Sequence, residues 1–157
     1  MLALVGGLAM WSAAKMSDSI RRIYEERTQP LAKLDDVGRT LERQRANILS
    51  TIAAPTDESI QLLSASVSTD RANLAKLLAE YRQGISNVQE QMQADHFMQL
   101  LDKMQKDGLL KVVAFLQKGQ TIEADVASQS TYQPQSLAVN RALDALIKLQ
   151  VSLAESE

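Results

Sequence analysis

Apolar residues recur along this chain with the spacing of amphipathic helices that pack into a bundle. Leu34, Leu41 and Ile48 form one column at seven-residue intervals. A second column alternates with the first at steps of three and four residues. Its members are Tyr24, Leu31, Gly38, Arg45 and Ile52. Alternation of this kind is typical of the seam along which helices pack in a bundle, so the pattern predicts an all-α fold.

Short breaks divide this pattern into four predicted helices, at about residues 15–53, 56–83, 87–118 and 121–157. Thr56 suits an N-cap, and Ser86 with Gln89 has the spacing of a capping box. Gly119 is suited to end the third helix, and Pro134 predicts a kink in the fourth.

The first fourteen residues, MLALVGGLAMWSAA, are apolar and carry no charged side chain. A membrane crossing needs about 20 such residues, so residues 1–14 are too short to cross alone. A signal-peptide core and a buried helical cap are alternatives, although the basic region that usually begins a signal peptide is missing. The favoured interpretation is the end of a truncated first transmembrane helix, because a polar helix continues it without a turn residue.

The second and third predicted helices match only part of the first and fourth. The unmatched parts, residues 15–26 and 149–157, then project at the same end as the apolar segment. The predicted fold is therefore an antiparallel up-down-up-down four-helix bundle, with long first and fourth helices extending toward the membrane.

Composition excludes several kinds of chemistry. The chain has no cysteine and one histidine, His96, which excludes disulfide scaffolds, thiol nucleophiles and multi-histidine metal sites. Its net charge of −2 predicts no nucleic-acid partner. The haem attachment sequence Cys-x-x-Cys-His is absent, as are phosphate loops and nucleophile–base pairs. We therefore expect no enzymatic activity, no cofactor and no metal.

Several motifs occur in an order that resembles one known family. The stretch IRRIYEERTQPL at residues 20–31 follows the apolar segment, and RANIL begins at Arg45. Asp107-Gly108-Leu109 and the final LDALIKLQ, residues 143–150, complete the set. The chain resembles the periplasmic four-helix sensor domain of bacterial methyl-accepting chemotaxis proteins over nearly its whole length. Lys103, Lys106, Leu110 and Lys111 depart from it, since arginine and proline are common around the Gly-Leu pair there.

This resemblance implies a sensory domain held between two transmembrane helices. It places residues 15–157 in the periplasm as the sensor bundle, anchored in the inner membrane, and residues 1–14 at the end of the first transmembrane helix. In such receptors a HAMP linker and a cytoplasmic signalling coil follow the sensor. We expect a homodimer formed through helices one and four.

Arginines on the first helix are candidates for binding an anion. Arg45 falls on the second seam column, where a buried guanidinium must find a negative partner. Arg43 lies beside it. An internal ion pair is the alternative, because residue counting puts Asp70 on the second helix level with Arg39, so that it could pair with Arg39 or Arg43.

The first half of the fourth helix is unusually polar, and counting from the loops puts it level with Arg43. Its apolar seam at Val139, Leu143, Leu146 and Leu153 extends backward to Ser136, Tyr132, Gln129 and Asp125. A helix built only for packing would carry apolar side chains there. The candidate ligand-binding residues are Arg43, Arg45, Ser128, Gln129, Thr131, Tyr132 and Lys103. The alternative interpretation is a solvated polar face near Pro134.

Together these features predict the ligand-sensing domain of a transmembrane chemoreceptor. It would bind a small organic anion, a carboxylate or an amino acid, and transmit a displacement of helix four across the membrane. Two alternatives remain open at this point: the equivalent sensor bundle of a membrane histidine kinase, and a structural helical module without a ligand.

Overall fold

The computed structural model describes residues 29–155, and every regular element in that range is helical. Residues 1–14, the predicted helix start at residue 15 and the final residues 156–157 lie outside the described part. None of the helices within residues 29–155 combines the length and the hydropathy that a membrane crossing requires.

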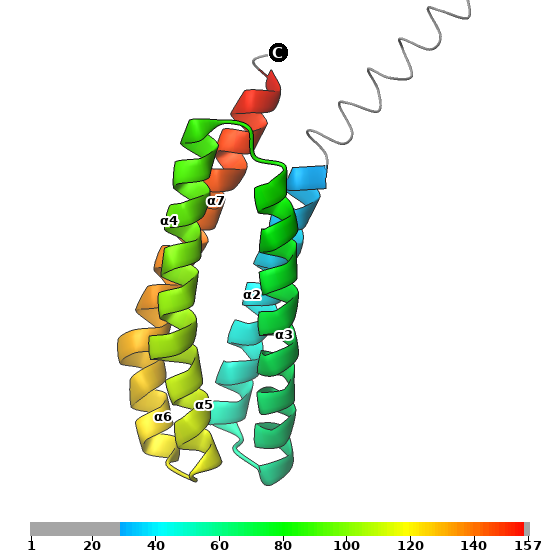
Figure 1. Cartoon of the computed structure of the whole chain (residues 1–157). Helices are drawn as coiled ribbons and strands as arrows, with labels where there is room; N and C mark the ends of the chain where they lie inside the picture. The colour runs from blue at the N-terminus through cyan, green and yellow to red at the C-terminus, as the bar shows by residue number, and fades with distance from the viewer. Residues whose placement is uncertain (1–28, 156–157) are drawn as a thin grey trace, which may run out of the picture.

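Four helical rods run side by side in alternate directions (Figure 1) within the described residues. The first two rods are single helices, α2 (Gln29–Ala53) and α3 (Asp57–Gln83). The third rod consists of α4 (Val88–Lys103), η2 (Met104–Leu109) and α5 (Leu110–Gln117). The fourth consists of α6 (Thr121–Ala127), η3 (Ser128–Tyr132) and α7 (Gln133–Glu155). The predicted all-α four-helix bundle is confirmed.

Local hydrogen bonds explain where the second and third rods begin. Thr56 caps α3 as predicted, because its hydroxyl accepts from the Ser59 amide at 3.1 Å while Ser59 Oγ accepts from the Thr56 amide at 2.9 Å. The capping box predicted at Ser86 and Gln89 is wrong. Asn87 is the cap instead, since its Oδ1 accepts from the Gln89 amide at 2.7 Å and from the Glu90 amide at 3.3 Å.

Gly119 ends the third rod, as predicted. Its φ of 72° lies in the left-handed region that favours glycine. The Gly119 amide donates to the Leu116 carbonyl at 3.0 Å, and the Gln120 amide donates to the Phe115 carbonyl at 2.9 Å. These two bonds form a Schellman motif, which turns the chain sharply into α6.

The buried seam of α2 follows only one of the two predicted columns. Leu34, Leu41 and Ile48 are buried, as the pattern predicted. The partner column, however, is Val37, Gln44 and Thr51, all buried. The predicted placement of Arg45 in the seam is therefore wrong, and its side chain is 49% exposed. Polar Gln44 and Thr51 hid the true column, whereas apolar Leu31 and Ile52 suggested the neighbouring one.

Two π-helical segments interrupt the third and fourth rods. In η3 the Gln133 amide donates to the Ser128 carbonyl, and in η2 the Leu110 amide donates to the Gln105 carbonyl, five residues back in each case. A π turn holds one more residue than an α turn, so each segment shifts the helix face by one position. Pro134 explains η3, because proline cannot donate to the carbonyl four residues before it.

The π-helical segments η2 and η3 pack against each other. Gly108 in η2 makes this possible, since a Cβ there would lie 3.0 Å from Tyr132 Cα and 2.8 Å from Gln135 Oε1. The absence of a side chain at Gly108 therefore sets how closely the third rod approaches the fourth.

A buried polar cluster ties three rods together near the described chain ends. Tyr81 Oη donates to Glu90 Oε1 at 2.7 Å, and Gln150 Nε2 donates to Tyr81 Oη at 3.1 Å and to the same carboxylate. All three side chains are buried, so the cluster holds the carboxyl-terminal part of α7 against α3 and α4.

Gly108→Ala should destabilise the bundle although alanine favours helix more than glycine does. The added methyl group meets the Tyr132 backbone, so we expect a loss of about 2 kcal/mol in the free energy of unfolding, measured by urea denaturation. Gly38→Ala is the matched control. Its Cβ would meet only Leu143 Cδ2 at 3.4 Å, so it should be neutral or slightly stabilising. Equal effects of both variants would contradict the close approach of η2 and η3.

Candidate ligand site between the first and fourth rods

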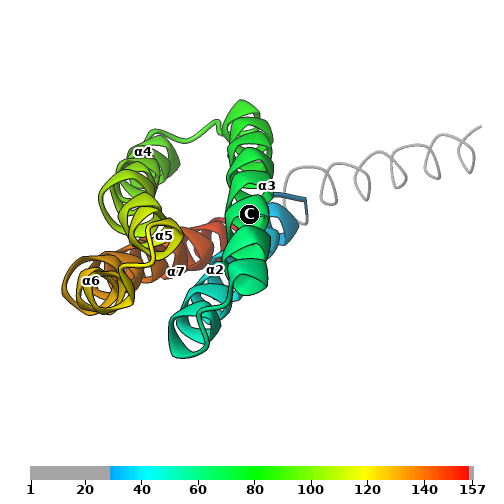
Figure 2. The same cartoon turned by 90° about the horizontal axis from the view of Figure 1, so that it is seen from below.

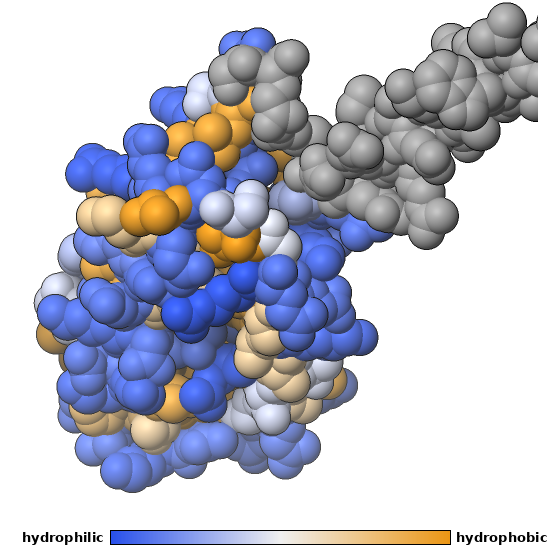
Figure 3. All heavy atoms as spheres, turned by 45° about the horizontal axis from the view of Figure 1, so that its top comes forward, coloured by the Kyte–Doolittle hydropathy of each residue, from blue (hydrophilic) through white to orange (hydrophobic). Residues whose placement is uncertain are grey.

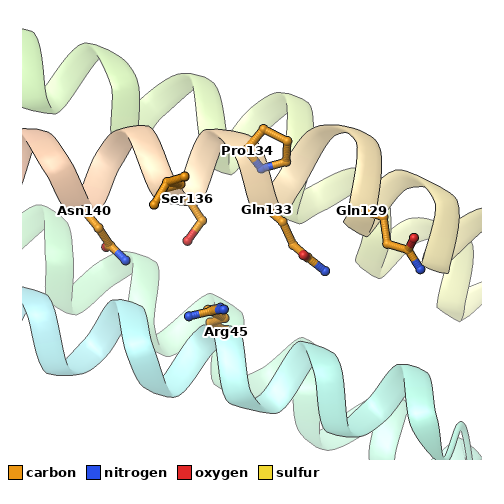
Figure 4. A pocket seen from close by; sticks show the side chains of 7 residues that line it. Arg45, Gln129, Gln133, Pro134, Ser136 and Asn140 are labelled. Atoms are coloured by element: carbon orange, nitrogen blue, oxygen red, sulfur yellow. The ribbon is translucent and has the colours of Figure 1, made fainter.

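A cavity of about 380 Å³ lies between α2 and the fourth rod. The residues that line it are Arg45, Gln129, Gln133, Pro134, Ser136, Leu137 and Asn140. Figure 4 shows the side chains of Gln133, Ser136 and Asn140 pointing across the gap toward α2, from which Arg45 projects. The volume falls within the range of small-molecule sites, roughly 300 to 1,000 Å³.

Arg45 supplies the positive charge of this cavity. Its nearest carboxylate is Glu42 on the preceding turn of α2, whose Oε2 lies 3.9 Å from the guanidinium Nη1. Glu42 also accepts a hydrogen bond from Asn140 Nδ2 at 3.2 Å. Because the Glu42 contact is long and shared, the Arg45 guanidinium keeps donors for a second anion.

Neutral polar groups form the opposite wall. Gln129 donates to Asp125 at 2.9 Å, which holds its amide at the rim. Ser136 is buried, and its hydroxyl lies near the buried side chain of Tyr132. Burial raises the pKa of Tyr132 to about 12, although the attraction of Arg45 and the nearby Ser136 hydroxyl both act to lower it. Tyr132 is therefore a neutral phenol near pH 7, and the wall adds no negative charge of its own.

The structure brings together only some of the candidates named from the sequence. Arg45 and Gln129 line the cavity, whereas Tyr132 is buried and does not line it. Ser128 is buried, and its hydroxyl has no hydrogen-bond partner among the described residues. Thr131, whose hydroxyl lies 3.4 Å from that of Ser130, does not line the cavity.

Lys103 lies exposed on α4 and does not line the cavity either.

Arg43 contacts a different partner. Its guanidinium binds the carboxylate of Asp70 on α3, whose side chain is only 3% exposed. Ser66 Oγ lies 3.4 Å from the second oxygen of Asp70. The alternative of an internal ion pair thus holds for Arg43, while Arg39 pairs with Asp35 on its own helix.

The face of the fourth rod differs from the prediction by one residue before Tyr132. Ala124 and Ser128 are buried there, whereas Asp125 and Gln129, expected on the seam, lie nearer the surface. The extra residue in the π turn causes this shift. It moves Gln129 out of the core and onto the cavity rim.

Sequence reasoning missed Gln133, Leu137 and Asn140 as ligand contacts. It treated Ser136 only as part of the seam and Pro134 only as the cause of a kink. A signal was present, because Gln129, Gln133, Ser136 and Asn140 follow each other at steps of four, three and four residues. Such steps place polar side chains in one stripe along a helix.

The fold and this cavity define a class of structure, a four-helix bundle with a polar cavity between two of its rods. The model of four-helix-bundle sensory modules for signal transduction matches residues 1–157. The chain therefore belongs to this family of chemotaxis signal-transduction modules. No curated protein and no solved structure matches the chain. Among residues 29–155, no group of three or more histidine or acidic side chains could hold a metal ion.

Arg43→Ala should destabilise the bundle, because it leaves the buried Asp70 carboxylate without its cation. We expect a loss of about 2 kcal/mol in the free energy of unfolding, less than for a fully buried pair since Arg43 is half exposed. Arg45→Ala should change the stability by under about 0.5 kcal/mol. In an Asp70→Asn background, Arg43→Ala should lose most of its effect. An undiminished effect in that background would contradict the ion pair.

Raising the pH should test the buried phenol of Tyr132. In an unfolded chain the hydroxyl ionises near pH 10.0, whereas its pKa in the bundle is about 12. The stabilisation from a raised pKa is complete below the unfolded value and is lost as the pH rises through the folded value. Tyr132→Phe should therefore be less stable than the wild type by about 1 kcal/mol at neutral pH, where it lacks the polar contacts of the hydroxyl. Urea denaturation should show this difference shrinking above about pH 10, and a constant difference would contradict the assignment.

Proposed function

We propose that this chain is the ligand-sensing domain of a transmembrane chemoreceptor and that it binds a small organic anion in the cavity between α2 and the fourth rod. The observation that carries the proposal is Arg45, a half-exposed guanidinium with one long contact to a carboxylate, facing neutral amides and a hydroxyl across about 380 Å³. Paired donors of a guanidinium match the two oxygens of a carboxylate.

The neighbouring residues limit the charge of the ligand. Asn140 also lines an adjoining space of about 340 Å³, whose charged residues are Asp35, Arg39, Glu42 and Asp144, one cation against three acids. A ligand with one carboxylate on Arg45 avoids these acids, whereas a citrate-like polyanion would face repulsion. An amino acid could place its ammonium group toward Glu42. We therefore favour monocarboxylates and amino acids.

Signalling would follow from the way this ligand bridges two rods. Its carboxylate would be bound by α2, while Gln133 and Asn140 on α7 would orient the rest. A ligand shifts an equilibrium only when it prefers one arrangement, and a bridge of this kind prefers one height of α7 relative to α2. We propose that the resulting displacement of helix four crosses the inner membrane. The domain would work in the periplasm as a homodimer formed through helices one and four.

A ligand screen followed by isothermal titration calorimetry tests this proposal. Thermal-shift measurements on the 157-residue chain with organic acids and amino acids should give at least one carboxylate that raises the melting temperature. Arg45→Ala should weaken its affinity about 10- to 100-fold, the loss of one charge-assisted contact pair.

The control variants separate the arginines. Lys103→Ala should bind as the wild type does, and Arg43→Ala should lose stability while keeping its affinity. A melting-temperature shift that survives Arg45→Ala unchanged, or the absence of any shift across the screen, would refute the site.

A further inference from the structure

A second cavity lies on the other side of the bundle, between α3 and the third rod. It has a volume of about 340 Å³. Figure 2 shows that α3 and α4 lie on the side of the bundle away from the α2–α7 pair, and no described helix covers the gap between them. A ligand there would not compete with one bound at Arg45.

The floor of this second cavity is apolar. Leu74 and Leu78 of α3 and Leu101 of α4 are buried beneath it, and Met98 is partly buried beside them. Ala75 and Ala79 on α3 are small and exposed, so the α3 side of the cavity is shallow. In Figure 3, separate hydrophobic areas are visible among mostly hydrophilic side chains.

Of the cations that line the second cavity, Arg71 has no acidic partner among the described residues. Arg82 pairs with Asp95 at 2.9 Å, and Asp102 pairs with Lys106 at 2.7 Å. Within residues 29–155, Arg71 forms no ion pair. Its Nε donates to the neutral Gln105 Oε1 at 3.3 Å. This bond orients the guanidinium and leaves its two terminal amino groups available to an anion.

We propose that the second cavity is a binding site for an amphipathic monocarboxylate. Its carboxylate binds Arg71, and its apolar body covers Leu74, Leu78 and Leu101. Leu78 lies about 10 Å from Arg71 along the helix, the length of a medium aliphatic chain or an aromatic acid. A second carboxylate at the far end is disfavoured, because it would lie against the apolar floor, and Arg82, which lines that end, is already paired with Asp95.

The test is a nuclear magnetic resonance titration of the full 157-residue chain, with octanoate as the probe. We expect saturable shifts of the methyl signals of Leu74, Leu78, Met98 and Leu101. Butyrate lacks the apolar body, octanol lacks the charge, and suberate has the body with two charges. Each of these three should bind at least about fivefold more weakly than octanoate.

Two variants test the site independently, one by removing its positive charge and the other by filling its volume. Arg71→Gln should weaken octanoate binding about tenfold, and Ala75→Leu should block the cavity without removing the charge. Arg45→Gln is the matched control and should leave the affinity for octanoate unchanged.

Three results would overturn the proposal. One is octanoate binding that Arg71→Gln leaves unchanged. Another is octanol binding as tightly as octanoate, which would reduce the effect to nonspecific apolar contact. The third is the absence of saturable shifts in these four residues.

Discussion

The missing backbone donor of Pro134 is the constraint on which the candidate site depends. An α-helix that reaches this proline loses one hydrogen bond, and the fourth rod accommodates the loss in η3, where bonds reach back five residues. The extra residue turns Ser128 into the core and Gln129 toward α2. On the third rod, Gly108 lets η2 approach the widened turn closely. The polar wall of the cavity therefore results from the way the extra residue in η3 rotates the face of the fourth rod.

The sequence predicted the four rods well, because their ends depend on local chemistry. Thr56 and Gly119 act over a few residues, and the leucine column of α2 repeats without ambiguity. Side-chain placement was harder to predict wherever distant contacts decide which face of a helix is buried. Arg45 was assigned to the seam because buried Gln44 is polar, and the π turns left no clear mark in the pattern. Of the candidate site, Arg45 and Gln129 line the cavity, while Arg43 is bound to Asp70.

Buried polar groups are hydrogen-bonded in one part of the bundle and unpaired in another, and this difference affects how helix four could move. Near the described chain ends, the buried cluster of Tyr81, Glu90 and Gln150 is hydrogen-bonded across three rods. Gln44 is fully buried, yet neither end of its amide has a hydrogen-bond partner among the described residues, and the same holds for the Ser128 hydroxyl. Each such group costs about 1 to 3 kcal/mol, so the polar layers hold the rods less firmly than the leucine layers do.

The central claim is that a carboxylate bound at Arg45 shifts α7 relative to α2. The chain has no cysteine, so spin labels can be attached through Ala32→Cys on α2 and Ala145→Cys on α7 without background labelling. Pulsed electron paramagnetic resonance then measures this distance with and without the carboxylate found by screening. The account predicts that the α2–α7 distance distribution changes, that Arg45→Ala abolishes the change, and that a control pair at Ala32 and Ala79 stays constant. An α2–α7 distance that does not change at saturating ligand would contradict it.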